Sequence, residues 1–388
     1  MTVLDRLDAA IPLSPEESLL LDSVRALADE RIGPNAAHFD RTGEFPRDNV
    51  AAINALGLNA MFVPEEYGGS PVSYICYLAC VRAISAACAS TGIIWATNFH
   101  AMKPLVDFGS DEQKRRLLPR IVAGGLASLA ITEADAGSDA TAMRTRFSAA
   151  GDAVLVNGAK SFITNGDVAD LYLVFGKWDG IDDPRAAITA LIIEHGTPGL
   201  DVLRTEEKLG HRASSTAAIA FSDCRVPRAN LVGAPGDGLR LLLASLNTSR
   251  PSVAAHALGI ARAAFEDAVR YVNERRQGGR RIVENQAIQF MLADHATDLA
   301  LTEAWLWRVG HLVDHGAENY AVEASMLKLR ASDLAMRIAT DAVQLLGGYG
   351  YTRDFRVERL FRDAKVTQIW EGTNQIHRQF IGRSFVER

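Results

Sequence analysis

Cysteine, an excess of basic charge and a leader-like start are all scarce or missing in this sequence, and each shortage argues against a class of protein. The four cysteines, Cys76, Cys80, Cys88 and Cys224, form no Cys-X-X-Cys pair, so we expect buried, reduced thiols in a cytoplasmic protein and no zinc site. The net charge is −6 with both signs interspersed, which argues against a nucleic-acid surface. The first residues lack a basic segment followed by an apolar core, so no signal peptide is predicted.

The one long apolar run, residues 74–96, does not predict a membrane span. It contains Arg82 and several serines and threonines, and its flanks differ from those of a spanning segment. We therefore expect a pair of buried helices in this region.

The hydrophobic period divides the 388 residues into three parts. Helical patterns occupy residues 1–125, a period of two occupies 126–236, and long helical patterns return from 237 to 388. Strands are expected around 154–156, 171–175 and 188–193, and the later helices at 238–275, 286–315 and 319–346. The predicted fold class is α+β, with an N-terminal helical domain, a mostly antiparallel middle domain of the β-sandwich or barrel type, and a C-terminal four-helix bundle.

Two helix starts carry recognisable capping residues. Ser14 can cap a helix in which Pro15 takes the first position and Glu17 lies three residues after the cap. Ser110 or Asp111 can cap another helix.

Glu371 is an acid that follows Trp370 and precedes Gly372. Apolar and aromatic neighbours disfavour the charged form of a carboxylate, and an acid tuned in this way can remove a proton from carbon and release it again. Gly372 has no side chain, so a substrate can approach the backbone closely. The alternative is an acid that caps a helix, followed by a glycine in a turn, and these neighbours alone do not exclude it.

Two segments at the start of the β region could contact a ligand. Residues 129–140 combine small residues with the hydroxyls of Thr132 and Ser138, although an acidic surface loop explains them equally and no GxSxG elbow is present. In residues 160–166, alternation places Phe162 and Thr164 on one face of a strand. An aromatic ring beside a hydroxyl would suit a flavin, and a strand leading into an Asn-Gly turn is the alternative.

Two further segments lie at helix ends. Residues 273–286 contain four arginines around Gly278 and Gly279; they could bind a pyrophosphate or form a solvated basic loop. Residues 344–350 are glycine-rich but do not follow a strand as a dinucleotide-binding motif does, and a helix C-cap explains them.

These segments occur together and in one order, and in that combination the chain resembles the acyl-CoA dehydrogenase family over nearly its whole length. The most specific matches are residues 131–133, 136–139, 163–166, 345–350, 362–365 and 371–373. The resemblance implies FAD as cofactor and an acyl-CoA thioester as substrate, and it identifies Glu371 as the base. Glu371 would take the α-proton while the β-hydrogen leaves as hydride to flavin N5. The developing enolate oxygen would be stabilised by the Glu371 backbone N–H and a ribityl hydroxyl of FAD.

The resemblance also implies roles for other residues. The residues that would contact the flavin ring, or lie in the loop beside it, are Ile131, Thr132, Gly137, Ser138, Phe162 and Thr164. The residues that would contact the pyrophosphate and adenosine, partly across a subunit boundary, are Arg275, Gln286, Gln344 and Gly348. Thr373 and Gln375 match the remaining cofactor contacts, and Ser138, Asn247, Arg250 and Gly372 match substrate contacts. The resemblance further implies a homotetramer or homodimer and an electron-transferring flavoprotein as acceptor.

Three residues depart from the family pattern. Phe162 replaces a frequent Trp, Gly278 a frequent Phe, and Asn247 a frequent Asp, so the ring cover, the adenosine packing and the contact to the carrier arm can differ. Some relatives carry the base at the position of residue 249, which is Ser249 here. Trp95 suggests a short or unusually shaped acyl pocket, although a core tryptophan is the alternative.

Other functions remain open on the sequence. The substrate could be a thioester on a carrier protein, the enzyme could be a flavin oxidase or monooxygenase of the same fold, or the chain could be a non-catalytic member. Glu371 argues against the last, because burying an acid costs free energy that a purely structural protein need not bear. His311 and His315 share a helix face but lack a third ligand, so no metal is expected.

Overall fold

The structure is a computed structural model that describes residues 3–386; residues 1, 2, 387 and 388, which the predicted outer domains include, lie outside the described residues. Seven α-helices precede the sheet: α1 (Val3–Ala9), α2 (Pro15–Leu27), α3 (Gly33–Thr42), α4 (Arg47–Ala55), α5 (Tyr74–Ala87), α6 (Ala89–Phe108) and α7 (Asp111–Val122). Both predicted caps are present. Ser14 forms a capping box with Glu17, and Ser110 forms one with Gln113.

The predicted pair of buried helices is α5 and α6, whose side chains are buried along most of both helices. The second continues beyond the predicted end to Phe108. Both helices pack against α8, so their apolar surface faces protein on several sides. Among the described residues, no helix is long and apolar enough to span a membrane. All four cysteines are free and buried, as expected.

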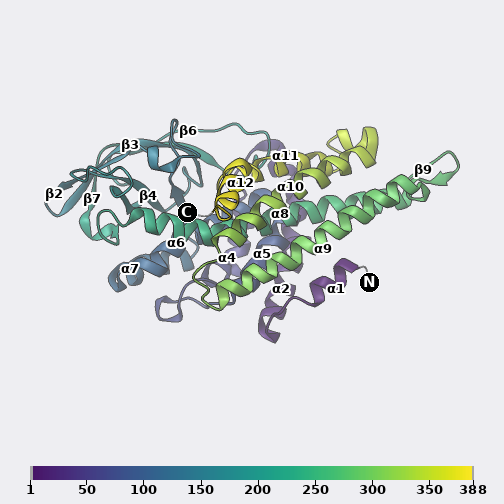
Figure 1. Ribbon diagram of the computed structural model, residues 1–388, viewed down its shortest axis with the longest axis horizontal. Helices are drawn as coiled ribbons and strands as arrows, with labels where there is room; N and C mark the ends of the chain where they lie inside the picture. The colour runs from purple at the N-terminus through teal and green to yellow at the C-terminus, as the bar shows by residue number, and fades with distance from the viewer. Residues whose placement is uncertain (1–2, 387–388) are drawn as a thin grey trace.

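The middle of the chain forms one eight-stranded sheet (Figure 1). Its strands are β1 (Ala127–Ala130), β2 (Arg146–Ala150), β3 (Ala153–Thr164), β4 (Leu171–Trp178), β5 (Ile188–Glu194), β6 (Leu200–Thr205), β7 (Thr216–Pro227) and β8 (Leu231–Val232). The order is β6-β7-β3-β2-β4-β5-β8, with β1 also paired to β4. The predicted antiparallel pairing holds except where β1 and β2 run parallel to β4.

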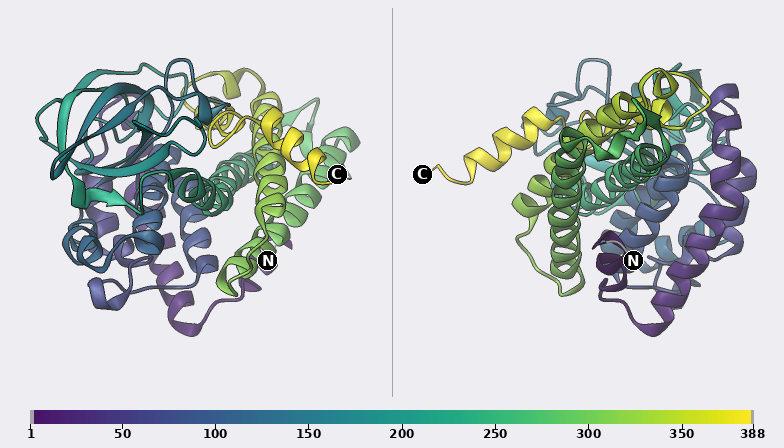
Figure 2. Two further views of the ribbon diagram at one scale, coloured as in Figure 1. Left: turned by 60° about the vertical axis from the view of Figure 1, so that its left-hand side comes forward. Right: turned by 90° about the vertical axis from the view of Figure 1, so that its right-hand side faces the viewer.

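The C-terminal helices are α8 (Gly238–Glu274), α9 (Gln286–Asp314), α10 (Ala321–Leu346), α11 (Val357–Thr367) and α12 (Asn374–Arg383). The first three end within two residues of the predicted bounds. The arginine-rich segment differs from the expected loop, because it forms a hairpin of β9 (Arg276–Gln277) and β10 (Arg280–Arg281). Gly278 and Gly279 have φ of 59° and 83° at its turn, where glycine is favoured. Figure 2 shows α12 reaching out from the rest of the molecule.

Helix α8 lies at the centre of the molecule and joins its parts. In one core, its middle packs with α5, α9 and α10. In a second core, Leu241 and Leu242 at its start pack with α6, α7 and one face of the sheet. The third core, around Phe147 and Tyr172, lies within the β domain. The segments around α8 are therefore held to one rigid helix.

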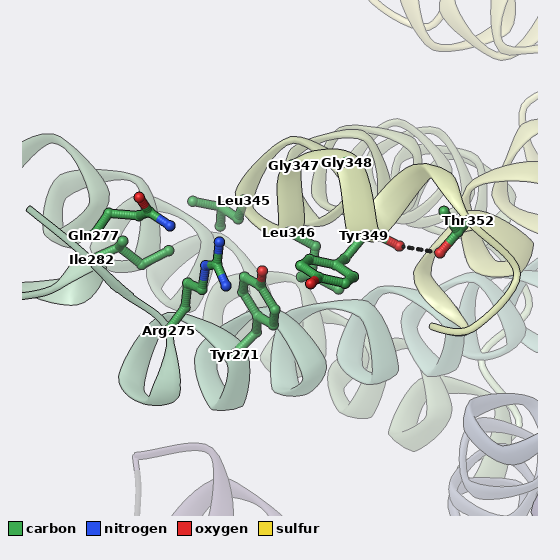
Figure 3. A pocket seen from close by; sticks show the side chains of 10 residues that line it. All are labelled: Tyr271, Arg275, Gln277, Ile282, Leu345, Leu346, Gly347, Gly348, Tyr349 and Thr352. Carbon is green, nitrogen blue, oxygen red and sulfur yellow. Dashed lines mark hydrogen bonds between the residues drawn. The ribbon is translucent and has the colours of Figure 1, made fainter.

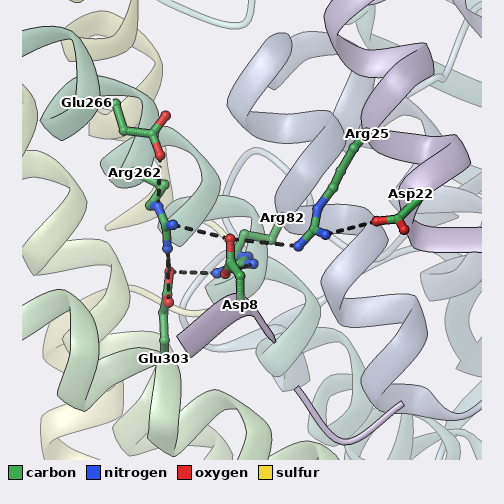
Figure 4. A network of polar contacts seen from close by, with 7 residues as sticks. All are labelled: Asp8, Asp22, Arg25, Arg82, Arg262, Glu266 and Glu303. Atoms are coloured by element: carbon green, nitrogen blue, oxygen red, sulfur yellow. Dashed lines mark hydrogen bonds and ion pairs between the residues drawn. The ribbon is translucent and has the colours of Figure 1, made fainter. Parts of the chain in front are cut away.

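A network of charged side chains ties α1 to the core formed by α5, α8, α9 and α10 (Figure 4). Arg82 of α5 and Arg262 of α8 both contact Asp8 and Glu303, at 2.6–3.3 Å. Arg82 lies 2.8 Å from Glu303, which is 1% exposed. Each buried charge thus has opposite charges as neighbours, which buried ions require.

Candidate active site

Glu371 lies half-buried in the short loop between α11 and α12. Glu371 and Gly372 have φ of 52° and 93°, the left-handed region that costs energy for a residue with a Cβ. Glu371 is not the cap of α12, which was the alternative. The cap is Thr373, whose side chain accepts a hydrogen bond from the N–H of Ile376.

Buried side chains hold the backbone of this loop. His377 Nε2 lies 3.1 Å from the carbonyl oxygen of Glu371, and Lys328 Nζ donates to the carbonyl oxygen of Gly372 at 2.7 Å. A carbonyl only accepts, so His377 carries its proton on Nε2. Burial, aided by the charges of Lys328 and Arg250, lowers the pKa of His377 to about 3, so the imidazole is neutral near pH 7.

The carboxylate of Glu371 meets helix α8. Ser249 Oγ donates to its Oε2 at 2.6 Å. Arg250, the next residue, is largely buried, and this burial lowers its pKa although Glu371 acts in the opposite direction. Arg250 Nη1 lies 3.4 Å from Asn247 Oδ1, so the structure brings both predicted substrate contacts on α8 close to Glu371.

Two buried histidines support Trp370, the residue before Glu371. His211 Nε2 and His256 Nε2 are 2.8 Å apart, and both rings pack against Trp370, at 5.0 and 5.5 Å between centroids. Burial lowers the pKa of His256 to about 3 and that of His211 well below its usual value. Burial raises the pKa of Asp363, which accepts from the His211 N–H, to about 6.

A group of polar and aromatic side chains, which includes His100, lies near Glu371. Ser252 Oγ is 2.9 Å from both His100 Nε2 and the Tyr77 hydroxyl. Tyr77 stacks on Phe99 at 4.4 Å and meets Trp95 at 5.4 Å. Trp95 is buried in this cluster, and its expected effect on the acyl pocket stays a prediction.

The predicted flavin contacts of the β domain gather at the ends of β1 and β3. The Ser161 N–H donates to the Thr132 carbonyl at 2.8 Å and joins the two segments. Ile131 packs in the same core as Leu246 of α8, three residues from Ser249. Phe162 is 64% exposed with φ of 59°, so an aromatic ring is offered at the surface there.

The alternation expected for Phe162 and Thr164 assumes a regular strand, but β3 is irregular at Phe162. The pairing of β3 with β7 shifts between Lys160 and Ile163, and Phe162 lies in this bulge. A bulge adds a residue to one strand and interrupts the alternation of faces, so the pleat alone does not put the two side chains on one side.

Glu133 and Lys160 anchor the loop that follows β1. The Glu133 carboxylate accepts from the N–H groups of Arg144 and Thr145, at 2.6 and 2.9 Å. Lys160 Nζ lies 2.8 Å from Glu133 Oε1 and 2.9 Å from the Ile131 carbonyl. Burial lowers the pKa of Lys160 to about 8. Gly137 and Ser138 lie exposed on the loop held in this way.

Thr373 and Gln375, two further predicted cofactor contacts, lie at the start of α12, whereas the predicted contacts to the pyrophosphate and adenosine lie around the C-terminal end of α8. A cavity of about 490 Å³ there is lined by Arg275, Gln277, Gly348 and Tyr349 among others (Figure 3). Arg275 packs over the Tyr349 ring at 5.6 Å. A Cβ on Gly348 would meet no atom within 4 Å, so the cavity is open at this glycine.

The predicted site residues therefore form two groups. The first lies around Glu371 and the ends of β1 and β3; the second includes Arg275, Gln286, Gln344 and Gly348. Gln344 and Gln286 are exposed near the ends of α10 and α9. Arg275 follows the end of α8, about 40 Å along the helix from Ser249 at 1.5 Å per residue. One chain does not bring both groups together.

Lys328 and His377 were missed as parts of the site. Lys328 shares a face of α10 with the buried residues Ala324, Ala331 and Ala335, and a lysine in such an apolar stripe is a signal that periodicity could have found. His377 lies one turn into α12, but no pattern shows that it reaches back to the Glu371 carbonyl.

The three domain models of one family match the chain. These are the acyl-CoA dehydrogenase N-terminal domain at residues 14–125, the middle domain at 128–224 and the C-terminal domain at 236–386. An acyl-CoA dehydrogenase of Bacillus subtilis is 42% identical, over 96% of this chain and 98% of that protein.

Solved structures agree with the domain models. Butyryl-CoA dehydrogenase from Megasphaera elsdenii superposes with a TM-score of 0.94 at 33% identity, over 97% of this chain and 99% of that one. A chain from a structure described as the electron transferring flavoprotein of Acidaminococcus fermentans has the same TM-score at 38% identity, with coverage of 97% and 99%.

Proposed function

This chain belongs to the acyl-CoA dehydrogenase family, and from that premise we propose that Glu371 is the base that removes the α-proton of its acyl-CoA substrate. The protein is a flavoprotein oxidoreductase of the acyl-CoA dehydrogenase type. The observation that carries the proposal is the placement of Glu371: a half-buried carboxylate in a left-handed loop, aimed at α8 and held by Ser249.

The hydrogen bonds of the carboxylate suit a base. Ser249 donates to Oε2, and this charge-assisted hydrogen bond holds the carboxylate in one orientation. Within residues 3–386, Oε1 accepts no hydrogen bond from a neighbour and is available to a substrate C–H.

The backbone N–H of the same residue can stabilise the carbonyl oxygen of the thioester. An α C–H becomes acidic enough only when its carbonyl oxygen is stabilised by donors as charge develops. Among the described residues, the N–H of Glu371 donates to no carbonyl. It can therefore donate to the thioester oxygen while the carboxylate of the same residue takes the proton.

The residues of the β domain fit FAD. The exposed Phe162 ring offers an apolar cover, Thr132 and Thr164 add hydroxyls, and a Cβ on Gly137 would meet no atom within 4 Å, which leaves room for a ligand. Bound FAD would supply, at flavin N5, the acceptor for the β-hydrogen that leaves as hydride. Ser138, Asn247, Arg250 and Gly372 would contact the substrate.

The separation of the two groups of cofactor residues supports assembly from several copies. Arg275, Gln286, Gln344 and Gly348 would hold the pyrophosphate and adenosine of FAD bound mainly by another copy, with Thr373 and Gln375 completing the cofactor contacts. The projecting helix α12, with Phe380 exposed, offers a surface to such a copy. The proposed assembly is a homotetramer or homodimer in the cytoplasm. An electron-transferring flavoprotein is the proposed acceptor, supported by the likeness to the Acidaminococcus fermentans structure.

The test is anaerobic mixing of the purified protein with a panel of acyl-CoA thioesters while the flavin absorbance is followed. The wild-type protein bleaches with its substrate. Glu371→Gln keeps the shape of the side chain, so it retains FAD but loses bleaching. Glu112→Gln on the exposed face of α7 is the matched control and bleaches normally. Bleaching of Glu371→Gln at the wild-type rate would contradict the proposal.

A further inference from the structure

The loop that carries Glu371 adopts an unfavourable backbone and needs outside support. Glu371 and Gly372 both have positive φ, and a residue with a Cβ keeps that conformation only where its surroundings impose it. A Cβ on Gly372 would lie 3.2 Å from His377 Nε2, so the loop is also closely packed. The atoms that fix its peptide groups therefore decide where the carboxylate points.

The support comes from helix α10, and Lys328 makes its central contacts. The side chain of Lys328 is fully buried. Its ammonium donates to the Gly372 carbonyl at 2.7 Å and to Asn374 Oδ1 at 3.0 Å. Asn374 also donates to Ser332 Oγ at 2.9 Å and to Asp333 Oδ1 at 2.7 Å, so one face of α10 holds both sides of Thr373.

Burying the ammonium of Lys328 costs free energy, which indicates that this residue does more than fill space in the core. Burial lowers the pKa of Lys328 to about 7, because an ammonium loses hydration in the interior. An apolar side chain at this position of α10 would avoid that cost. Both oxygen atoms that Lys328 contacts belong to the Glu371 loop and its continuation into α12, so the ammonium stabilises that loop.

Lys328 also takes part in the electrostatics of the base. The charged groups that face it are Glu371 and Asp333, which attract it, and Arg250, which repels it. His377 lies in the same group and is neutral near pH 7. In its charged form, which prevails below about pH 7, Lys328 attracts the Glu371 carboxylate.

We propose that Lys328 is a positioning residue for α-proton abstraction: it fixes the Gly372 peptide and thereby aims the Glu371 carboxylate and N–H at the thioester. The inference rests on the proposed role of Glu371. Lys328 does not touch the reacting atoms; it acts through the backbone of the loop and through its charge.

The test compares Lys328→Met, which removes both donor and charge, with Lys328→Gln, which keeps a donor without the charge. Flavin reduction by saturating acyl-CoA should slow by about 10- to 100-fold in Lys328→Met, since a displacement of about 1 Å has effects of that size. The substrate concentration for half-maximal rate should change little. Lys328→Gln should recover part of the rate, and in both variants the acidic limb of the pH profile should move to higher pH.

Lys114→Met is the matched control, because this lysine lies on α7, where its charged neighbour is Asp111. A rate and a pH profile equal to wild type in Lys328→Met, with FAD retained, would overturn the proposal. If Lys328→Met does not fold, Lys328→Gln decides, and an unshifted pH profile there would overturn it equally. Glu371→Gln is measured alongside. If its flavin is reduced at the wild-type rate, the proposed role of Glu371 as base is rejected. If Glu371→Gln is inactive while Lys328→Met behaves as wild type, only the proposed role of Lys328 is rejected.

Discussion

The hydroxyl of Ser249 lies 2.6 Å from Oε2 of Glu371, although the two residues are 122 positions apart in the chain. Ser249 lies on α8, the helix that joins the cores, while Glu371 lies on a loop in a left-handed conformation. The contact therefore fixes a strained segment to the central helix of the fold. It also places residue 249 within one hydrogen bond of Glu371, the proposed base.

The first prediction concerns this hydrogen bond. Ser249→Ala removes a donor to a carboxylate, and such a bond contributes about 1.5–3 kcal/mol. We expect the acidic limb of the pH profile of flavin reduction to move up by about one pH unit, since 1.4 kcal/mol corresponds to one unit. Stopped-flow reduction from pH 5.5 to 9 measures this shift. Thr248→Val is the control, because Thr248 Oγ1 bonds only to carbonyls of its own helix; equal profiles for both variants would refute the prediction.

The second prediction moves the base. Because Ser249 Oγ is in contact with Glu371 Oε2, a carboxylate on residue 249 can occupy the space left by a glycine at 371. Glu371→Gly alone should keep FAD and lose flavin reduction. Adding Ser249→Glu should restore reduction to about 1% of the wild-type rate or more, because the displaced carboxylate loses part of its alignment. A double variant that retains FAD and remains as inactive as Glu371→Gly would show that α8 cannot position a base.

Local features of the sequence predicted much of the fold. The Ser14 capping box and the ends of α8, α9 and α10 depend on neighbours within a turn or two, and the structure has them within two residues. The change of period correctly separated the sheet from the helices. Two local features were not predicted. The bulge at Phe162 and the hairpin at Gly278 and Gly279 are not visible in hydrophobic alternation.

The site was predictable only in part, for a similar reason. Glu371 could be singled out as a candidate because its acid, tryptophan and glycine are adjacent in the chain, but only the family resemblance suggested its role. Lys328 and Ser249 reach the loop from helices that are remote in sequence, and their contacts exist only after those helices pack. A buried lysine on an apolar face indicates a buried partner, but the sequence does not say which one.

The third prediction concerns the loop after β1. Lys160→Met leaves the Glu133 carboxylate buried without its cation and frees the Ile131 carbonyl. We expect the loop with Thr132 and Ser138 to loosen and the dissociation constant for FAD to rise about tenfold or more. Flavin absorbance before and after gel filtration measures the loss. Thr145→Val removes only one of the donors to Glu133 and should lose less flavin; an equal loss in both variants would speak against the Lys160 contact as the anchor.

The fourth prediction concerns the charge network around α1. Glu303→Ala leaves the buried Arg82 and Arg262 only the partly exposed Asp8 and Glu266 as partners, and removing one partner of buried charges costs about 3–5 kcal/mol. Urea unfolding should show this loss in the free energy of unfolding. Asp22→Ala breaks the neighbouring pair with Arg25, in which the Asp22 side chain is 69% exposed, and should cost about 1 kcal/mol or less. Similar losses in the free energy of unfolding of the two variants would show that Glu303 contributes no more to stability than an exposed ion pair.

The fifth prediction concerns pH and the histidines beneath Trp370. The pKa of His256 falls from 6.5 to about 3 on folding, and that of His211 falls well below 6.5. The unfolded chain therefore binds more protons at both residues as the pH drops below 6.5, and the folded state loses stability. Asp363 acts in the opposite direction, because its pKa rises to about 6 on folding and its contribution to stability grows as the pH falls from 6 toward 4. The two histidines outweigh the one aspartate, so between pH 6 and 4 this cluster lowers the free energy of unfolding on acidification.

His256→Gln isolates that effect, since glutamine keeps hydrogen-bonding groups near Ser85 and His211 but does not titrate. The slope of the free energy of unfolding against pH between 4 and 6 should become less steep by up to about 1.4 kcal/mol per pH unit, the value for one proton. Urea titrations at several pH values give the slope, which is independent of any constant loss of stability in the variant. His38→Gln removes an exposed histidine and should leave the slope unchanged. A wild-type slope in His256→Gln would mean that His256 takes up its proton in the folded protein, with a charged imidazole directly beneath Trp370.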